Sequence, residues 1–192
     1  MYRIRIHGRG GQGIKTGGRI LGSALFASGF EVQDAPLYGA ERRGAPMWAH
    51  VRAAHEPIHE RGAITHPDLV VVADETLLPL PAAGVLAGVS TTTVLLVRGT
   101  TAADAWRDRL GGACGTVVAL PCGGTDDASA PATVGVECAG AAARLLGVVT
   151  RETLASALRA ELAGHDPATV ERARARANAA FDALAPHAGA VR

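Results

Sequence analysis

The feature that most constrains this chain is a glycine-rich segment between a strand-like stretch and a helix-like one. Residues 3–21 read RIRIHGRGGQGIKTGGRIL, and four of the six residues in 8–13 are glycine. A glycine loop that follows a strand and opens a helix presents backbone N–H groups and the positive end of the helix dipole at one point, where they favour an anion. We therefore expect a strand–loop–helix unit that can hold a phosphate.

Hydrophobic periodicity divides the chain into strands and helices. Alternating or continuous apolar runs predict strands over residues 2–7, 31–34, 47–54, 68–75, 91–99 and 115–122. Apolar residues at helical spacing predict helices over residues 14–28, 134–147, 150–162 and 166–184. Strands separated by helices or long connections indicate an α/β protein. We expect a single domain over 1–192, a three-layer α/β/α fold with a mostly parallel or mixed sheet and the glycine-rich loop after strand 1.

Individual residues indicate where these elements begin and end. Gly29 is expected to end the first helix, and Thr150 and Asp166 to begin the last two. Pro36 and Gly39 are expected to turn the chain into an irregular loop after the second strand.

Composition excludes several classes of protein. Hydrophobic residues make up 48% and charged residues 19% of the 192 residues, which is too apolar for a disordered chain. The formal net charge is +1, so no overall field attracts nucleic acid. The sequence opens without a basic-then-apolar leader, and no apolar run reaches the roughly 18–20 residues of a membrane span. We expect a cytoplasmic protein that binds neither nucleic acid nor membrane.

The potential metal ligands are scattered. The three cysteines form no CxxC pair, match no zinc or iron–sulfur spacing and are expected to be free thiols. They are Cys114, Cys122 and Cys138. His55 and His59 are four residues apart, but Pro57 between them argues against a helix that presents both to one metal. No metal site is therefore expected.

The dinucleotide fingerprint GxGxxG is one interpretation of the loop. Gly8, Gly10 and Gly13 fit it letter for letter, in the expected position between a strand and a helix. Glu31 or Asp34, near the end of the second strand, would then supply the acid that binds the ribose. A free-standing NAD(P)-dependent reductase is therefore one alternative.

A P-loop is the second interpretation. It requires a lysine directly after the last glycine, whereas Ile14 separates Gly13 from Lys15 and Thr16 here. A slip of one residue turns a side chain by about 100° around a helix, away from the phosphates. An NTPase is not expected.

A longer pattern is more specific than either motif. It consists of GRGGQG at 8–13, GRILGSAL at 18–25 and DAPLYGAERRGAP at 34–46, in this order and spacing. Together with PDLVVVADETLL at 67–78 and a helical last third, it resembles the gamma subunit of 2-oxoacid:ferredoxin oxidoreductases over essentially the whole chain. This is the domain shared by the pyruvate, 2-oxoglutarate, 2-oxoisovalerate, indolepyruvate and phenylglyoxylate enzymes.

The resemblance implies a part in a larger assembly. Such enzymes decarboxylate a 2-oxoacid with thiamine diphosphate, coenzyme A and iron–sulfur clusters, and give an acyl-CoA, carbon dioxide and reduced ferredoxin. This chain has neither a GDG motif for magnesium and thiamine diphosphate nor a cysteine set for a [4Fe-4S] cluster. These groups are therefore expected in partner subunits, and the chain is expected to be inactive alone. The 2-oxoacid and the final acceptor, ferredoxin or NAD, stay open.

Coenzyme A is the ligand that the resemblance suggests for the loop. Its phosphates suit backbone N–H groups at a helix start and the forked donors of arginine. The residues expected to bind it are Gly8, Arg9, Gly10, Gly11, Gln12, Gly13, Lys15, Thr16, Tyr38, Arg42 and Arg43. A packing role is the alternative: the glycines would allow close contact with a partner subunit, the arginines would form intersubunit ion pairs, and the chain would be a non-catalytic scaffold.

The sequence departs from the family pattern at two places. KTGG stands at 15–18, where the family often carries Thr-Ala, and 119–147 lacks the usual Asn-Thr or Asn-Met before its helix. No functional residue is carried over onto this second segment. Residues 123–131 within it, GGTDDASAP, are expected to form the most mobile loop.

Overall fold

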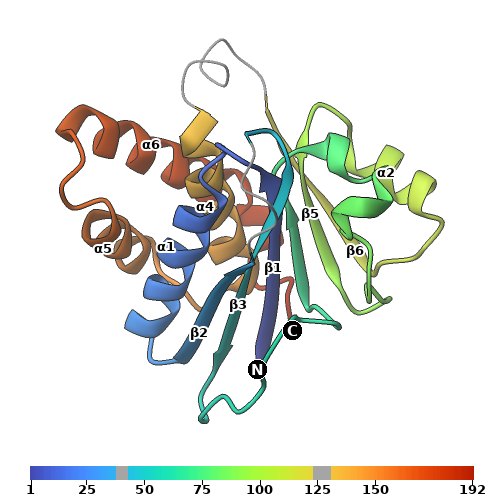
Figure 1. Cartoon of the computed structure of the whole chain (residues 1–192), viewed down its shortest axis with the longest axis horizontal. Helices are drawn as coiled ribbons and strands as arrows, with labels where there is room; N and C mark the ends of the chain where they lie inside the picture. The colour runs from blue at the N-terminus through green and yellow to red at the C-terminus, as the bar shows by residue number, and fades with distance from the viewer. Residues whose placement is uncertain (38–42, 123–130) are drawn as a thin grey trace.

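The computed structural model describes residues 1–37, 43–122 and 131–192, which are organised around a six-stranded sheet (Figure 1). The strands are β1 (Tyr2–Arg9), β2 (Glu31–Leu37), β3 (Pro46–Ala54), β4 (Leu69–Val72), β5 (Val94–Gly99) and β6 (Thr116–Pro121). Their order across the sheet is β2-β3-β1-β4-β5-β6. Strands β1, β4, β5 and β6 are parallel, whereas β3 lies antiparallel between β1 and β2. The predicted α/β fold with a mixed sheet is confirmed.

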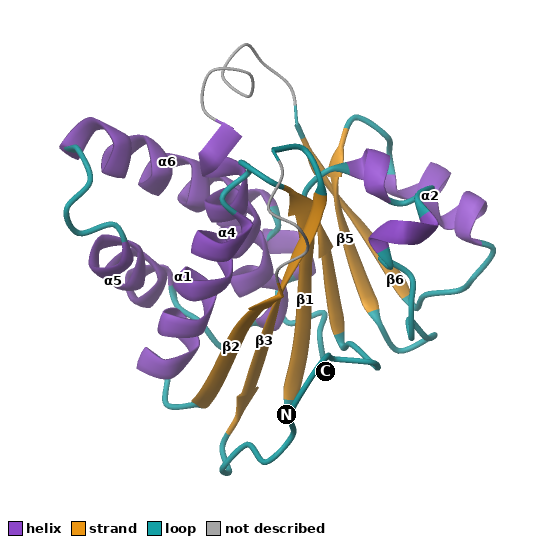
Figure 2. Ribbon diagram, viewed as in Figure 1, coloured by secondary structure: helices purple, strands orange, loops and turns teal. Residues whose placement is uncertain are grey.

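Helices cover the two faces of this sheet unequally, as Figure 2 shows. One face carries α1 (Ile14–Ala27), α4 (Val134–Leu146), α5 (Arg151–Glu161) and α6 (Pro167–Ala183), while α2 (Ala103–Leu110) lies on the other. Short 3₁₀ helices complete the described chain: η1 (Glu75–Leu77), η2 (Pro81–Ala83), η3 (Pro131–Thr133) and η4 (Ala185–His187). No helix of the described residues is long and apolar enough to cross a bilayer.

Side chains of β1 alternate between the two faces. Ile4 and Ile6 are fully buried in the large hydrophobic cluster under the four helices, so Arg5 and His7 point to the opposite face. On that face β4, β5 and β6 form a smaller apolar cluster with Trp106 of α2. The second face is therefore apolar under α2 and polar beside β1 and β3.

Helices α1 and α4 approach each other at glycines. A β-carbon on Gly17 of α1 would lie only 2.6 Å from the carbonyl carbon of Gly135 in α4, well inside van der Waals contact. A β-carbon on Gly135 would in turn collide with the carbonyl group of Gly13, the residue that precedes α1. The two helices therefore begin side by side, next to the end of β1.

The predicted helices are confirmed, each to within one residue at either end. Gly29 follows the C-cap of α1 with φ 91°, the left-handed conformation expected of a terminating glycine. The side chain of Thr150 accepts a hydrogen bond from the Thr153 N–H at the start of α5. The side chain of Asp166 accepts from the first free N–H groups of α6.

Some predictions about local structure were wrong, including the start of the strand expected over 91–99, which begins at Val94. Strand β2 does not end before Pro36 but pairs with β3 as far as Leu37, because an edge strand has one side without a ladder partner and tolerates proline there. Strand β4 ends at Val72 rather than at residue 75, since Asp74 caps η1 instead. Helix α2 was not predicted at all. The predictions for Gly39 and for the loop over 123–130 fall outside the described residues.

Candidate functional site

The glycine loop and the arginine-containing segment 43–46, far apart in the sequence, meet at the end of β1. The Gly10 N–H donates to the Ala45 carbonyl over 2.9 Å, and the Gly44 N–H donates to the Gly10 carbonyl over 3.1 Å. The Arg43 side chain passes directly over Gly11, because a β-carbon on Gly11 would lie 3.8 Å from Arg43 Cγ and 3.9 Å from Nε. An exposed guanidinium therefore lies along the glycine loop.

Arg9, one of the residues predicted to bind coenzyme A, forms hydrogen bonds within the chain. Its guanidinium donates to the Asp74 carboxylate over 2.8 Å, to the Gly44 carbonyl over 3.1 Å and to the Thr76 hydroxyl over 2.7 Å. These three partners lie in two different segments on either side of the loop. The hydrogen bonds hold the loop in place and leave Arg9 less suited to a phosphate than Arg43.

Gln12 also forms hydrogen bonds that hold the loop in place. Its side-chain oxygen accepts the Arg9 N–H over 2.7 Å, and its backbone carbonyl accepts the Gly135 N–H over 2.8 Å. A β-carbon on Gly8 would lie 2.9 Å from that side-chain oxygen and closer still to Ile14, so the space around Gly8 is filled. The loop is thus packed from within the chain, against α4 and its own side chains.

The first turn of α1 has neither a side-chain cap from its N-cap residue nor an acidic residue of its own. Gly13 is the N-cap residue and supplies no side-chain hydrogen bond, and the first turn contains no acidic residue. The first four N–H groups of a helix lack intrahelical partners. An anion at this helix start would therefore meet backbone N–H groups and the positive end of the dipole.

The structure describes most of the remaining predicted site residues. Lys15 is exposed on the first turn of α1, and Thr16 beside it is half-buried. Gly8, Gly10, Gly11 and Gly13 form the loop itself. Tyr38 and Arg42 fall outside the described residues.

The acids predicted for a dinucleotide lie in the wrong part of the sheet. Glu31 pairs with Ala54 and Asp34 with Val51, and β3 separates both from β1. In register, Asp34 is level with Ile4, four residues before Gly8 along β1, which corresponds to about 13 Å of strand. A dinucleotide fold places its second strand directly beside the first, so the ribose would not reach either acid.

Two acids that follow the neighbouring strand β4 were not predicted. Asp74 and Glu75 follow β4, and Glu75 accepts hydrogen bonds from the N–H groups of Thr100 and Thr101 after β5. These hydrogen bonds lower the pKa of Glu75 to about 2 in spite of the opposing effect of desolvation. Their position directly after a buried strand, at the edge where α/β proteins bind ligands, was the signal available in the sequence.

The potential metal ligands do not come together in the described residues, where no group of three or more His, Cys, Asp or Glu side chains is arranged to hold an ion. Cys138 is fully buried in α4, and burial raises the pKa of its thiol to about 12. Cys114 is also buried, and desolvation raises its pKa. Neither thiol suits a metal cluster, whose ligands are thiolates.

Comparison with known proteins identifies a family that matches this chain. The family model for pyruvate ferredoxin/flavodoxin oxidoreductase matches residues 3–183. Pyruvate synthase subunit PorC of Thermotoga maritima is 49% identical over 96 residues, which are 50% of this chain and 48% of that protein. The chain thus spans about half the length of the curated relatives it matches.

Solved structures extend the likeness to nearly the whole chain. The crystal structure of pyruvate oxidoreductase subunit PORC from Thermotoga maritima has a TM-score of 0.69 at 32% identity and covers 94% of this chain and 95% of that one. A 2-oxoglutarate:ferredoxin oxidoreductase from Magnetococcus marinus, with 2-oxoglutarate, coenzyme A and succinyl-CoA bound, has a TM-score of 0.66 at 21% identity. It covers 95% of this chain and 31% of that chain, and at this identity it supports the fold alone.

Proposed function

The chain belongs to the pyruvate ferredoxin/flavodoxin oxidoreductase family, and we propose that it is the gamma subunit of a multisubunit 2-oxoacid oxidoreductase and helps to bind coenzyme A. The complex would convert a 2-oxoacid and coenzyme A to an acyl-CoA and carbon dioxide and pass the electrons to ferredoxin. The observation that carries the proposal is the meeting of Arg43 with an uncapped helix start at the glycine loop, within a family match over residues 3–183.

Coenzyme A fits the chemistry of this loop through its phosphates. The start of α1, which has no side-chain cap from Gly13, suits a phosphate through its backbone N–H groups and helix dipole, and the exposed Arg43 and Lys15 side chains add positive charge. Arg9 acts indirectly, because its hydrogen bonds to Asp74 and Thr76 set the position of the loop. The Magnetococcus marinus enzyme, whose structure shares this fold, is described with coenzyme A bound.

The other cofactors are assigned to partner subunits. Thiamine diphosphate supplies the carbanion chemistry of decarboxylation in this proposal, and iron–sulfur clusters carry the electrons. The described residues do not fit a cluster, because no three or more of their His, Cys, Asp or Glu side chains come together and Cys138 is buried with a raised pKa. This chain would contribute a binding surface and contacts for assembly, and no reacting group of its own.

The two rival functions receive less support from the geometry. A free-standing NAD(P) reductase would need Glu31 or Asp34 beside the loop, and β3 lies between them and β1. A purely structural scaffold explains Gly13 and Gly17, which pack on α4. It gives no reason for Arg43 to lie along an uncapped helix start.

The first experiment is a native pull-down of the tagged chain from its own anaerobic host, with mass spectrometry of the partners and an absorption spectrum of the eluate. Partners that carry thiamine diphosphate and brown iron–sulfur absorption are expected. A lone, colourless protein would contradict the proposal, and titration with NAD(P)H would then test the reductase alternative directly.

Kinetics of the purified complex test the coenzyme A site. Arg43→Ala removes one charged hydrogen-bonding group, worth about 1.5–3 kcal/mol, so the KM for coenzyme A should rise about tenfold or more while the KM for the 2-oxoacid stays nearly constant. Arg159→Ala is the matched control, because Arg159 is exposed on α5, away from the loop. Equal KM values for coenzyme A in Arg43→Ala and the control would refute the site without touching the assignment to the complex.

A further inference from the structure

The polar face of the sheet contains a cavity that the proposed function does not use. It has a volume of about 400 Å³ and lies against the adjacent strands β1 and β3, where Arg5 and His7 are in register with His50 and Trp48. Ile64 and Thr65 form one wall, and the segment around Ala83 to Gly88 forms the other. This volume is within the range of small-molecule sites in proteins.

Arg5 brings a buried charge to this cavity. Its residue is 5% exposed, and its guanidinium donates to the carbonyls of Ile64, over 3.3 Å, and Val85, over 2.8 Å. These bonds use two of the five N–H groups of an arginine, and the buried Nε–H has no hydrogen-bond partner among the described residues. No carboxylate of the described chain forms an ion pair with Arg5 or lines the cavity. A buried cation without a counter-ion is costly, so an anion from outside the chain would be strongly favoured there.

His7 lies next to that charge. It is only 3% exposed, and its ring nitrogens make no hydrogen bond of standard geometry among the described residues, although the Ala83 backbone comes close enough to raise its pKa slightly. Burial and the nearby Arg5 charge lower its pKa to about 3, so the ring is neutral and offers one donor and one acceptor. The Trp48 ring stacks on it, with centroids 6.0 Å apart, and provides a flat apolar surface.

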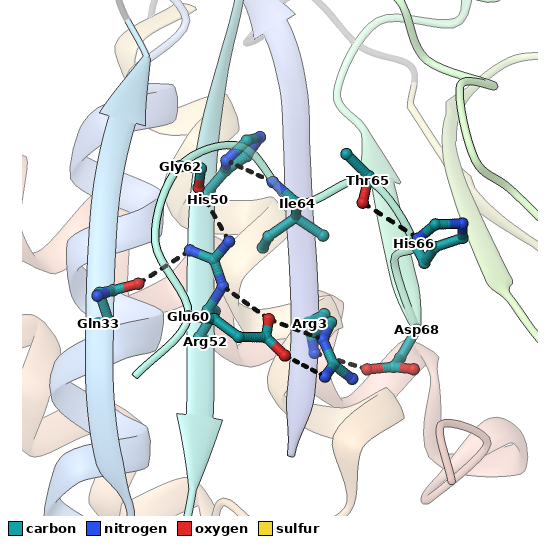
Figure 3. A network of polar contacts seen from close by, with 10 residues as sticks. All are labelled: Arg3, Gln33, His50, Arg52, Glu60, Gly62, Ile64, Thr65, His66 and Asp68. Atoms are coloured by element: carbon teal, nitrogen blue, oxygen red, sulfur yellow. Dashed lines mark hydrogen bonds and ion pairs between the residues drawn. The ribbon is translucent and has the colours of Figure 1, made fainter. Parts of the chain in front are cut away.

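The walls of the cavity are fixed by hydrogen bonds, as Figure 3 shows for the segment that carries Glu60 to Ile64. Arg52 on β3 donates to the Gly62 carbonyl over 2.9 Å and pairs with Glu60, while the Ile64 N–H donates to His50 Nδ1 over 3.2 Å. On the opposite wall, Gly88 lies so close to the Thr65 carbonyl group that any side chain there would collide with it. The cavity is therefore built into the fold.

We propose that this cavity binds a small apolar monocarboxylate, whose carboxylate meets Arg5 and His7 and whose apolar part lies on Trp48. A carboxylate matches the planar fork of a guanidinium and carries the single negative charge that one arginine between two neutral histidines can balance. Phosphate would bring up to two charges to a mostly apolar cavity. A flat hydrocarbon group of benzoate size suits the indole surface and the alanine-lined mouth. The inference does not rest on the proposed function.

Binding of benzoate to the full-length chain tests this site, with benzamide as the neutral isostere and inorganic phosphate as the probe for charge alone. Isothermal titration should give one saturable benzoate site, and benzoate should shift the ring ¹⁵N resonances of His7. Benzamide and phosphate should show neither effect at the same concentrations. Absence of saturable benzoate binding, or equal binding of benzamide, would overturn the proposal.

Variants distinguish this cavity from any other site on the chain. Arg5→Met should weaken benzoate binding at least tenfold, and Arg5→Lys should retain part of it. Ala87→Leu narrows the mouth from an exposed position and should weaken binding without affecting the fold, whereas Ala160→Leu, exposed on α5, should not. Unchanged binding in both Arg5→Met and Ala87→Leu would refute the assignment. A second pair of results would also refute the assignment: the parent chain binds no benzoate, and Arg5→Met loses a partner subunit in the pull-down. The cavity would then receive a group of that partner.

Discussion

Replacement of Gly17 by alanine tests whether the close approach of α1 and α4 determines the shape of the loop. The added methyl carbon would lie 2.6 Å from the Gly135 carbonyl carbon and 3.0 Å from its Cα, about 1 Å inside the usual contact of 3.5–4.0 Å. The obstacle is backbone within a helix, so no side-chain rotation relieves it. Gly22 in the same helix is the matched control, because a methyl there would meet Val32 Cγ1 at 3.4 Å, an ordinary contact.

The expected changes in stability have opposite signs. Alanine is favoured over glycine in a helix by about 1 kcal/mol, which should stabilise Gly22→Ala and raise its Tm by roughly 2–4 °C. In Gly17→Ala, overpacking at about 3 kcal/mol should outweigh that gain and leave a net loss of about 2 kcal/mol, or roughly 4–8 °C.

Thermal and urea unfolding of the full chain, followed by circular dichroism, measures both variants. The reasoning fails if Gly17→Ala is at least as stable as the parent chain, or if the two variants shift together. A further consequence is specific to the site: Gly17→Ala should raise the KM for coenzyme A in the complex, because separation of the two helices displaces the loop that precedes α1.

Two further predictions concern charge. Folding lowers the pKa of His7 to about 3 and that of His50 to about 4. Below pH 6.5 the unfolded chain therefore binds protons that the folded chain does not. The free energy of unfolding should fall as the pH drops from 6.5 toward 4, by up to about 1.4 kcal/mol per pH unit for each histidine. Urea unfolding between pH 7 and pH 4.5 should show this slope, and His7→Phe should flatten it; an unchanged slope would contradict the pKa values. The Arg9–Asp74 pair is partly buried, so a double-mutant cycle with alanine should give a coupling energy of about 1–2 kcal/mol by urea unfolding, whereas a value near zero would contradict its role in holding the loop.

Local signals in the sequence were sufficient for most of the elements. The capping residues Thr150 and Asp166 and the terminating Gly29 act through hydrogen bonds and dihedrals within a few residues, so they could be recognised without the fold. The extent of β2 was not predictable in this way. Its passage through Pro36 depends on the strand being at the edge, which is a property of the sheet and not of the segment.

The candidate site could likewise be predicted only where its features depend on local sequence. Two sequence motifs predicted that the loop binds an anion and that Arg43 belongs to the same site. No local rule, however, says that Arg43 lies over Gly11. The role of Arg9 could not be predicted, because its partner Asp74 lies 65 residues away and reaches the loop only through the parallel pairing of β1 and β4. The cavity at His7 depends likewise on the pairing of β1 with β3.

The sequence leaves two roles for the glycines open, packing and ligand binding, and the structure makes them compatible. Packing against α4 uses the carbonyl side of the loop, since the Gln12 carbonyl accepts the Gly135 N–H and the Gly13 carbonyl faces the same helix. The donors at the start of α1 remain without a capping side chain. A peptide unit directs its carbonyl and N–H groups in opposite directions, so the two peptide units whose carbonyls face α4 direct the N–H groups of Gly13 and Ile14 away from that helix. Each glycine that brings α4 closer therefore also fixes the donors that would meet a phosphate, and loss of packing and loss of coenzyme A affinity should accompany each other in Gly17→Ala but not in Arg43→Ala.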